Sequence, residues 1–457
     1  MKHPLFKKLL VIAVLTLLLM IPVMMIEGVV VERSSYRDEA RQSIATSWTG
    51  EQKLVGPILV VPYKEHYNLS LWDKKTERYV LKKQTREGRL LVAPELLQID
   101  ADVTTETRKR GIYSVPVYHS QLAVSGSFAL QKIEAFEKSS KHDIEWQQAY
   151  LSVLISDVRG VEIQPLLRWQ DKKLEFVPDA MLEGTYHGMH ASLGVLSHQN
   201  DLIDFSFELN MNGMESLQFA PVGKNTRVDI QADWPDPSFF GRYLPSSRAI
   251  DGSGFKANWN VSSFSSNTAQ YINACESGNC SQLMQDGFGV KLFNSVDIYQ
   301  QSERSVKYAV LFIGLTFASF FLYEVMKGLR LHPMHYLLVG LSLSVFYLLL
   351  ISLSEHMAFH YAYIMATMAS ASLIGFYIGS VLASRKHGML ITTALLLLYG
   401  MLYAILSSED NSLLMGSLLI FSVLSLVMVV TRRVDWYALT DGLSMQITKR
   451  SESEQTI

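Results

Sequence analysis

Residues 1–30, "MKHPLFKKLLVIAVLTLLLMIPVMMIEGVV", decide how the rest of the chain is arranged. Lys2, Lys7 and Lys8 precede an uncharged apolar run from Leu9 to Ile26. A secretory signal has a shorter apolar region, of roughly 7 to 15 residues, followed by a small-residue cleavage site. The text "IEGVVVERSS" that follows this run offers no such site. The stretch therefore predicts a retained transmembrane anchor, with a cleaved signal as the alternative.

The composition indicates a chain with more than one kind of structure. Its 457 residues exceed what a single hydrophobic core usually organises. Hydrophobic residues make up 49%, which fits a mixture of membrane and water-exposed regions. The net charge of -2 lacks the strong basic balance of nucleic-acid-binding proteins, so we exclude nucleic acid as a partner.

The middle of the chain, from about residue 54 to residue 301, has the pattern of β-strands. In "LIDFSFELNM" (residues 202–211), apolar and polar residues alternate, as in a strand with one buried face. "TRVDIQADW" (residues 226–234) repeats the pattern, and Asn212-Gly213 predicts a turn. We expect a large, mainly antiparallel β domain, with one or two sandwiches.

The text from Val306 to Val430 is apolar again and predicts five further membrane spans. Each approaches the ~20 residues that cross a hydrocarbon core of ~30 Å. The expected spans are Val306–Met326, Tyr336–Ser354, Ala358–Ala383, Met389–Leu406 and Ser412–Val430.

The charges of the short loops test this count. If the amino terminus is cytoplasmic, the inner loops contain Lys327 and Arg330, Arg385 and Lys386, and Arg432 and Arg433. The outer loops "SEHM" and "SSEDN" contain no Lys or Arg. Because positively charged residues favour the cytoplasmic side, the pattern predicts six spans with both termini in the cytoplasm.

We therefore expect an α+β membrane protein with a large periplasmic, mainly-β, sandwich-like domain and six transmembrane helices. One helix is the amino-terminal anchor, and five form a carboxy-terminal bundle. The expected regions are a cytoplasmic amino terminus (1–8), an anchor (9–31), a periplasmic β-rich domain (32–304), a five-helix transmembrane domain (305–430) and a cytoplasmic tail (431–457).

Two groups of polar residues at the expected outer ends of spans are candidate sites. Glu355 and His356 lie where the chain must turn, at the outer interface, where a charge costs little. With His360 they could bind zinc, but the H-E-x-x-H pattern is missing and a solvated turn is the favoured interpretation. Arg304 and Lys307 are expected to set the depth of the next span against lipid headgroups.

Glu324 is unusual among the residues of the apolar segments, because it is an acidic residue within a predicted span. An ionisable group inside a membrane is by default a functional candidate. Its position about one turn before Lys327 and Arg330 favours a simpler interpretation, an interfacial ion pair with those residues.

Cys275 and Cys280, in "CESGNC", are the only cysteines. In an oxidising compartment they predict a disulfide that closes a small loop. We find no G-x-S-x-G elbow, no nucleotide-binding loop and no convincing Ser/His/Asp grouping, and we predict no catalytic residue, no metal site and no cofactor.

Several stretches resemble the CreD family of bacterial inner-membrane proteins. They are "LVGPILVVPY", "WPDPSFFGRYLP", "GFKANWNVS", "RSVKYAVLFIGLTFASFFLYE" and "HPMHYLLVGLSLSVFYLLLISLSEH". The resemblance covers nearly the whole chain. It implies a role in cell-envelope integrity and tolerance of envelope-directed agents in Gram-negative bacteria, and it implies no established enzymatic activity and no catalytic residues.

We accordingly predict a non-enzymatic protein of the inner membrane, whose partners are the lipid bilayer and envelope proteins or lipids that contact the periplasmic domain. Two alternatives remain open. A transporter or lipid-handling protein would use a polar pathway through the helix bundle, and Glu324 would then be essential. A membrane-linked hydrolase would need a clustered nucleophile and base.

Overall fold

The structure is a computed structural model that describes residues 4–73, 78–182, 187–196, 202–292, 298–327, 331–407 and 412–432. The chain forms two compact units. Met1–Asp38 and Val296–Ile457 form the membrane unit, and Glu39–Ser295 form the β-rich unit. The amino-terminal helix α1 (Pro4–Ser47) contributes residues to both units.

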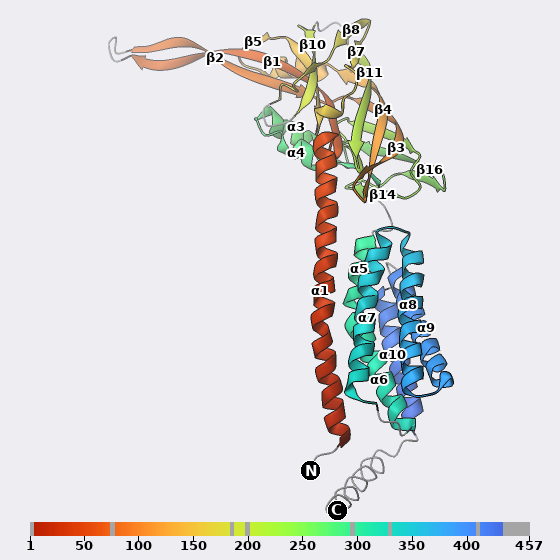
Figure 1. Cartoon of the computed structure of the whole chain (residues 1–457). Coiled ribbons are helices and arrows are strands. Elements are labelled where there is room, and N and C mark those ends of the chain that lie inside the picture. The colour runs from red at the N-terminus through yellow and green to blue at the C-terminus, as the bar shows by residue number, and fades with distance from the viewer. Residues whose placement is uncertain are drawn as a thin grey trace, which may run out of the picture. The chain divides into compact units, whose positions relative to one another are not determined.

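The membrane unit consists of apolar helices that run side by side (Figure 1). After α1 and the short, more polar α5 (Ile298–Lys307), they are α6 (Ala309–Lys327), α7 (Pro333–Ser354), α8 (Phe359–Val381), α9 (Arg385–Ser407) and α10 (Ser412–Thr431). Helix α1 and helices α6 to α9 are long and apolar enough to cross a membrane, and α10 contains the apolar stretch Leu414–Val429. The six expected spans therefore fit these helices.

The second expected span begins later than its sequence indicated. A break at Tyr308 separates α5 from α6, so Val306 and Lys307 belong to α5. Helix α5 is amphipathic, with Tyr299 and Ser302 buried, and it groups with the membrane helices, whereas the expected β-rich domain includes residues 298–304. An amphipathic helix has one apolar face that packs and one polar face, so its hydropathy alone does not indicate the unit to which it belongs.

One face of α1 packs against the other membrane helices. Leu19, Val23, Ile26 and Val30 are buried, and their spacing of four, three and four residues places them on one side of the helix. Leu19 packs directly over Gly340 of α7, where a Cβ atom would lie 2.1 Å from its Cδ1 atom. Small residues of this kind allow close approach between membrane helices, where van der Waals packing drives association.

A side chain at Gly340 should loosen this contact. We expect Gly340→Ala to lower the free energy of unfolding in nanodiscs by about 1–3 kcal/mol, because the added methyl overlaps Leu19 and Phe317. Leu19→Ala in the same chain should make the combined loss smaller than the sum of the two single losses. Gly400→Ala in α9 is the matched control, because nothing lies within 4 Å of its Cβ position. Equal effects at the two glycines would contradict the packing.

The β-rich unit contains two sheets. The nine-stranded sheet has the order β14-β17-β12-β1-β6-β10-β9, with β2 and β5 also paired to β1. Its strands are β1 (Gln52–Asp73), β2 (Arg78–Val92), β5 (Asp143–Trp146), β6 (Ala149–Ile155), β9 (Val177–Pro178), β10 (Gly188–Gly194), β12 (Ser216–Phe219), β14 (Pro237–Gly241) and β17 (Phe288–Leu292).

The eight-stranded sheet has the order β15-β16-β13-β3-β4-β11-β7-β8. Its strands are β3 (Leu96–Arg110), β4 (Tyr113–Ala129), β7 (Leu166–Trp169), β8 (Lys172–Glu175), β11 (Leu202–Met214), β13 (Asn225–Ala232), β15 (Ser247–Asp251) and β16 (Gly254–Ser262). The short helices are α2 (Gln131–Ser139), η1 (Val158–Gly160), α3 (Thr268–Glu276) and α4 (Ser281–Gln285). Both sheets contribute to one continuous hydrophobic core, so the expectation of a large β-rich domain is confirmed.

The alternation in residues 202–211 has the expected consequence, whereas the predicted turn after it is wrong. In β11 the alternating apolar residues from Ile203 to Met211 are buried in the core, whereas Leu202 at the start of the strand is exposed. Asn212 and Gly213 continue the strand, and the chain turns at Glu215, whose φ is 61°. Gly213 serves a different purpose, because a Cβ atom there would lie 2.2 Å from the hydroxyl of Tyr118, which is fully buried.

Candidate functional site

Glu324, in the last turn of α6, is the centre of a buried polar cluster within the membrane unit. Only 4% of the residue is exposed. Its Oε1 atom accepts hydrogen bonds from the ammonium of Lys8 and from the Leu331 N–H, which lies 2.9 Å away. Its Oε2 atom accepts a 2.9 Å hydrogen bond from the Tyr336 hydroxyl. The buried carboxylate thus accepts hydrogen bonds from three donors.

Lys8 of α1 makes two further contacts in this cluster. It also donates to the Leu331 carbonyl over 3.0 Å, and its Nζ atom lies 5.9 Å from the centre of the Tyr336 ring. The cluster therefore joins α1 to the end of α6 and the start of α7. The sequence pointed instead to Lys327 and Arg330 as partners of Glu324; Arg330 lies outside the described residues.

Glu355 occupies a second polar cluster, where α7 ends. Its Oε1 atom accepts a 3.3 Å hydrogen bond from the Tyr299 hydroxyl of α5 and lies 3.7 Å from Nε of Arg33. The guanidinium of Arg37 lies 5.5 Å from the centre of the Tyr299 ring, a cation–π distance. This cluster joins α1 to α5 and α7.

The two clusters lie near opposite ends of the apolar part of α1. Lys8 and Arg33 are roughly 37 Å apart along the helix at about 1.5 Å per residue. This separation exceeds a hydrocarbon core of ~30 Å. Both ion pairs can therefore lie near the membrane interfaces, where charged side chains are tolerated.

Two of the remaining membrane candidates, His356 and Lys307, have other contacts. His356 follows the end of α7 and is exposed, and its Nδ1 atom lies 3.1 Å from the Ser352 carbonyl oxygen of α7. Lys307 forms an ion pair of 2.7 Å with Glu303, and Arg304 lies on the same helix α5. Within the described ranges, no three His, Cys, Asp or Glu residues gather as metal ligands would.

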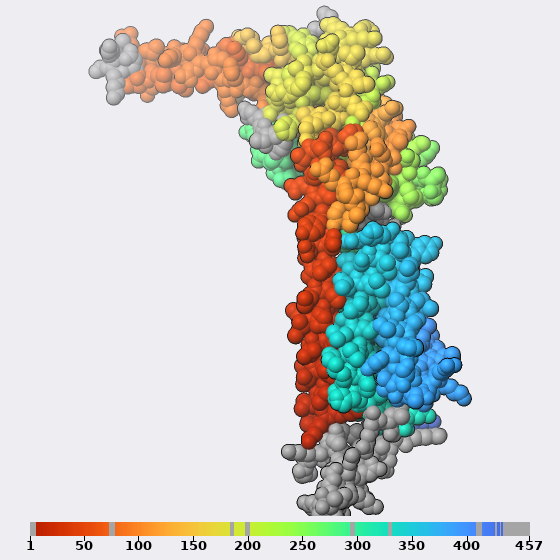
Figure 2. Space-filling view, viewed as in Figure 1, coloured from red at the N-terminus to blue at the C-terminus, as the bar shows by residue number. Residues whose placement is uncertain are grey.

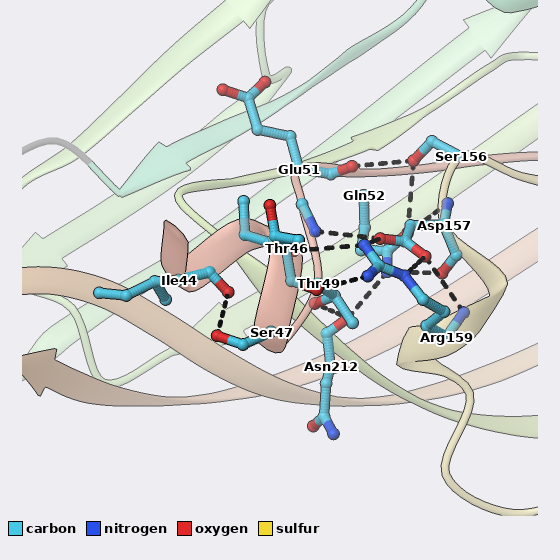
Figure 3. A network of polar contacts seen from close by, with 12 residues as sticks. Ile44, Thr46, Ser47, Thr49, Glu51, Gln52, Ser156, Asp157, Arg159 and Asn212 are labelled. Atoms are coloured by element: carbon cyan, nitrogen blue, oxygen red, sulfur yellow. Dashed lines mark hydrogen bonds and ion pairs between the residues drawn. The ribbon is translucent and has the colours of Figure 1, made fainter. Parts of the chain in front are cut away.

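A polar network that the sequence did not reveal lies in the β-rich unit, where the end of α1 meets β1 (Figure 3). Gln52 is fully buried. Its side-chain amide donates to the carbonyls of Asp157 and Asn212, each over 2.9 Å, and its oxygen accepts from the Asp157 N–H over 3.3 Å. Thr49 donates to the same Asn212 carbonyl over 3.1 Å. We call this group the α1–β1 joint.

Arg159 completes the α1–β1 joint by capping α1. Its guanidinium donates to the carbonyls of Thr46 over 2.7 Å and Ala45 over 3.2 Å, which are among the carbonyls that a helix end leaves without partners (Figure 3). It also forms a two-pronged contact with the Asp157 carboxylate. Burial by itself raises the pKa of Asp157, but the hydrogen bonds from Arg159 and Gly50 outweigh it and hold that pKa below its usual value.

Cys275 and Cys280 form a disulfide that joins the end of α3 to the start of α4, and both residues are buried. The guanidinium of Arg89, on β2, donates to the Cys275 carbonyl over 3.1 Å. The disulfide therefore stabilises a helical corner that packs on the nine-stranded sheet.

Removing this disulfide should have a moderate effect. We expect Cys275→Ser with Cys280→Ser to lower the free energy of unfolding by about 2 kcal/mol, the chain-entropy value for so short a loop. Denaturant unfolding with and without reductant measures it: the wild type should lose stability on reduction and the double variant should not. Loss of stability by both proteins on reduction would contradict the assignment.

Comparison with known proteins identifies clear relatives of the whole chain. The family described as "Inner membrane protein CreD" matches residues 4–437. The Inner membrane protein CreD of Escherichia coli (strain K12) is 36% identical over 439 residues, which cover 96% of this chain and 95% of that protein.

Two solved structures are similar over a part of the chain. An M1 zinc metallopeptidase from Deinococcus radiodurans, bound to a Tyr-Ser-Ala substrate, has 8% identity and a TM-score of 0.19 over 37% of this chain and 39% of its own. A second structure of an M1 zinc metallopeptidase from that organism has 7% identity and a TM-score of 0.18, over 37% and 38% of the two chains. Scores this low carry no functional argument.

Proposed function

This chain belongs to the CreD family of inner membrane proteins, and from that premise we propose that it supports the integrity of the bacterial envelope without catalysing a reaction. In this proposal the β-rich unit lies in the periplasm, where it contacts envelope proteins or lipids, and the membrane unit holds it there. Both termini lie in the cytoplasm.

The observation that supports the proposal most is that both carboxylate oxygens of Glu324 accept hydrogen bonds from neighbouring residues. The acidic residue that a proton relay or transporter would use is held by Lys8, Leu331 and Tyr336. Glu355 is held in a similar way by Tyr299 and Arg33. These contacts tie α1 to the bundle, which is what a protein needs if its task is to fix an attached domain at a membrane.

The proposed orientation agrees with the positions of the positive charges. The contact between Lys8 and Leu331 places the start of α1 beside the α6–α7 connection, which is preceded by Lys327. Because positive residues favour the cytoplasm, both segments belong on the cytoplasmic side. The chain then leaves the membrane near Arg33 on the other side, and the buried disulfide fits the oxidising periplasm.

Labelling by a membrane-impermeant maleimide tests the orientation. Ser253→Cys, at an exposed turn of the β-rich unit, should react in cells whose outer membrane alone is permeabilised. Lys386→Cys, exposed in the first turn of α9, should react only after the inner membrane is also opened. The reverse pattern would refute the proposed topology.

A deletion strain tests the role itself. Cells lacking the protein should become sensitive to detergents and β-lactams, and the wild-type chain should restore tolerance. Active-site probes for serine and cysteine hydrolases should not label the purified protein. Labelling that is lost on changing one Ser or His would establish an enzyme and overturn the proposal.

A further inference from the structure

The outer half of the β1–β2 hairpin exposes large apolar side chains. The two strands pair from Leu59 opposite Val92 to Asp73 opposite Arg78, a length of roughly 50 Å. Figures 1 and 2 show the hairpin projecting from the rest of the β-rich unit. Soluble surfaces rarely gather exposed apolar residues in one place without a binding role.

Both faces of this outer half are apolar. Trp72 lies opposite Tyr79 with their rings 5.0 Å apart, and Leu71 lies opposite Val80. Opposed residues share a face and successive residues alternate, so the two pairs lie on opposite faces. Tyr79 is 72% exposed and Trp72 53%. Leu81 adds to the face of Trp72 and Tyr79.

The charges also change along the hairpin. Near its base, Lys64 forms an ion pair of 3.7 Å with Glu87, and His66 lies 3.1 Å from a carboxylate oxygen of Glu145. Farther out, Lys82 lies opposite Leu69, and Lys83 lies opposite Asn68. The two lysines thus present positive charge beside the apolar pairs, facing residues that carry no charge.

We infer that the outer half of the β1–β2 hairpin inserts into the surface of an anionic lipid bilayer. A lipid surface surrounds what enters it and so covers both apolar faces, whereas a one-sided protein surface leaves one face in water. Trp and Tyr favour the membrane interface. Each lysine near an anionic surface should strengthen binding about fivefold.

This inference extends the proposed function by naming lipid as a contact of the β-rich unit. Its test does not depend on that function, because purified protein and vesicles suffice. Failure of the vesicle experiment would leave the orientation and sensitivity experiments untouched.

The experiment uses the full chain in nanodiscs of phosphatidylcholine, mixed with separate vesicles that are recovered by flotation. Vesicles with about 30% phosphatidylglycerol should recover several-fold more protein than pure phosphatidylcholine vesicles, and added salt should remove the difference. Trp72→Ser, Tyr79→Ser and Leu81→Ser combined should reduce recovery at least about tenfold. Lys82→Glu with Lys83→Glu should remove the preference for anionic lipid.

Two controls separate insertion from general stickiness. Ile163→Ser with Leu244→Ser removes similarly exposed apolar side chains elsewhere in the β-rich unit and should leave recovery unchanged. A polarity-sensitive dye on Ser70→Cys should shift to the blue with anionic vesicles, and the same dye on Ser253→Cys should not. The native disulfide leaves these introduced thiols as the reactive ones.

The inference is overturned if the variant with Trp72→Ser, Tyr79→Ser and Leu81→Ser is recovered with anionic vesicles as fully as the wild type while its melting temperature is unchanged. It is also overturned if the dye at residue 70 does not respond to vesicles, or if photocrosslinking from that position in cells recovers a protein and no lipid.

Discussion

Glu324→Gln is expected to destabilise the membrane unit by about 2–4 kcal/mol and to lower the amount of protein in the membrane. The amide keeps the size of the side chain but leaves the partly buried ammonium of Lys8 without its counter-charge. Removing one partner of a buried ion pair costs about 3–5 kcal/mol, and the partial exposure of Lys8 reduces this value. Unfolding by SDS in mixed micelles and immunoblots of membranes measure the two effects.

A double-mutant cycle shows whether the pair acts as a unit. Lys8→Met alone should destabilise, because it leaves a buried carboxylate, and Lys8→Met with Glu324→Gln should recover a large part of the loss. Lys7→Met is the matched control, because Lys7 is exposed and adjacent in sequence. The transporter alternative would be favoured if the Glu324→Gln protein had normal stability and abundance but had lost a substrate-dependent phenotype.

Gln52→Leu is expected to destabilise the β-rich unit by about 2–4 kcal/mol. Leucine has a similar volume but cannot donate to the Asp157 and Asn212 carbonyls or accept from the Asp157 N–H. Buried polar groups left without partners cost about 1–3 kcal/mol each, and Thr49 still satisfies one carbonyl. Denaturant unfolding of the full chain measures the loss, and limited proteolysis should show faster cleavage between α1 and β1.

The same substitution elsewhere supplies the control. Gln98 lies on β3 and bonds to the exposed carboxylate of Asp100 over 3.0 Å. Gln98→Leu should change stability by less than about 0.5 kcal/mol, as most surface substitutions do. If the two variants unfolded alike, the α1–β1 joint would contribute nothing particular to stability.

Local patterns in the sequence are enough to predict the kinds of elements and the faces that they bury. Uncharged runs of about 20 residues specify membrane helices, because only a helix satisfies its own backbone in lipid. Alternation in residues 202–211 specified the buried face of β11, because side chains of a strand point to opposite faces in turn. These patterns are local, so they can be recognised without knowing which helix or strand packs against the segment. The amphipathic helix α5 gives a weaker signal, because its polar face lowers the mean hydropathy of the segment.

The contacts between residues far apart in sequence follow from the packing of the folded chain. In the sequence, Lys8 is one of the positive residues that precede the membrane anchor. Nothing near it in sequence indicates its ion pair with Glu324, which is 316 positions away. Gln52 and Asn212, 160 positions apart, look like ordinary polar residues of strands, and Asn212-Gly213 reads as a turn. A hydrophobic pattern states that a face is buried, but hydrogen bonds and ion pairs depend on donors and acceptors brought within about 3 Å by packing, which no local pattern records.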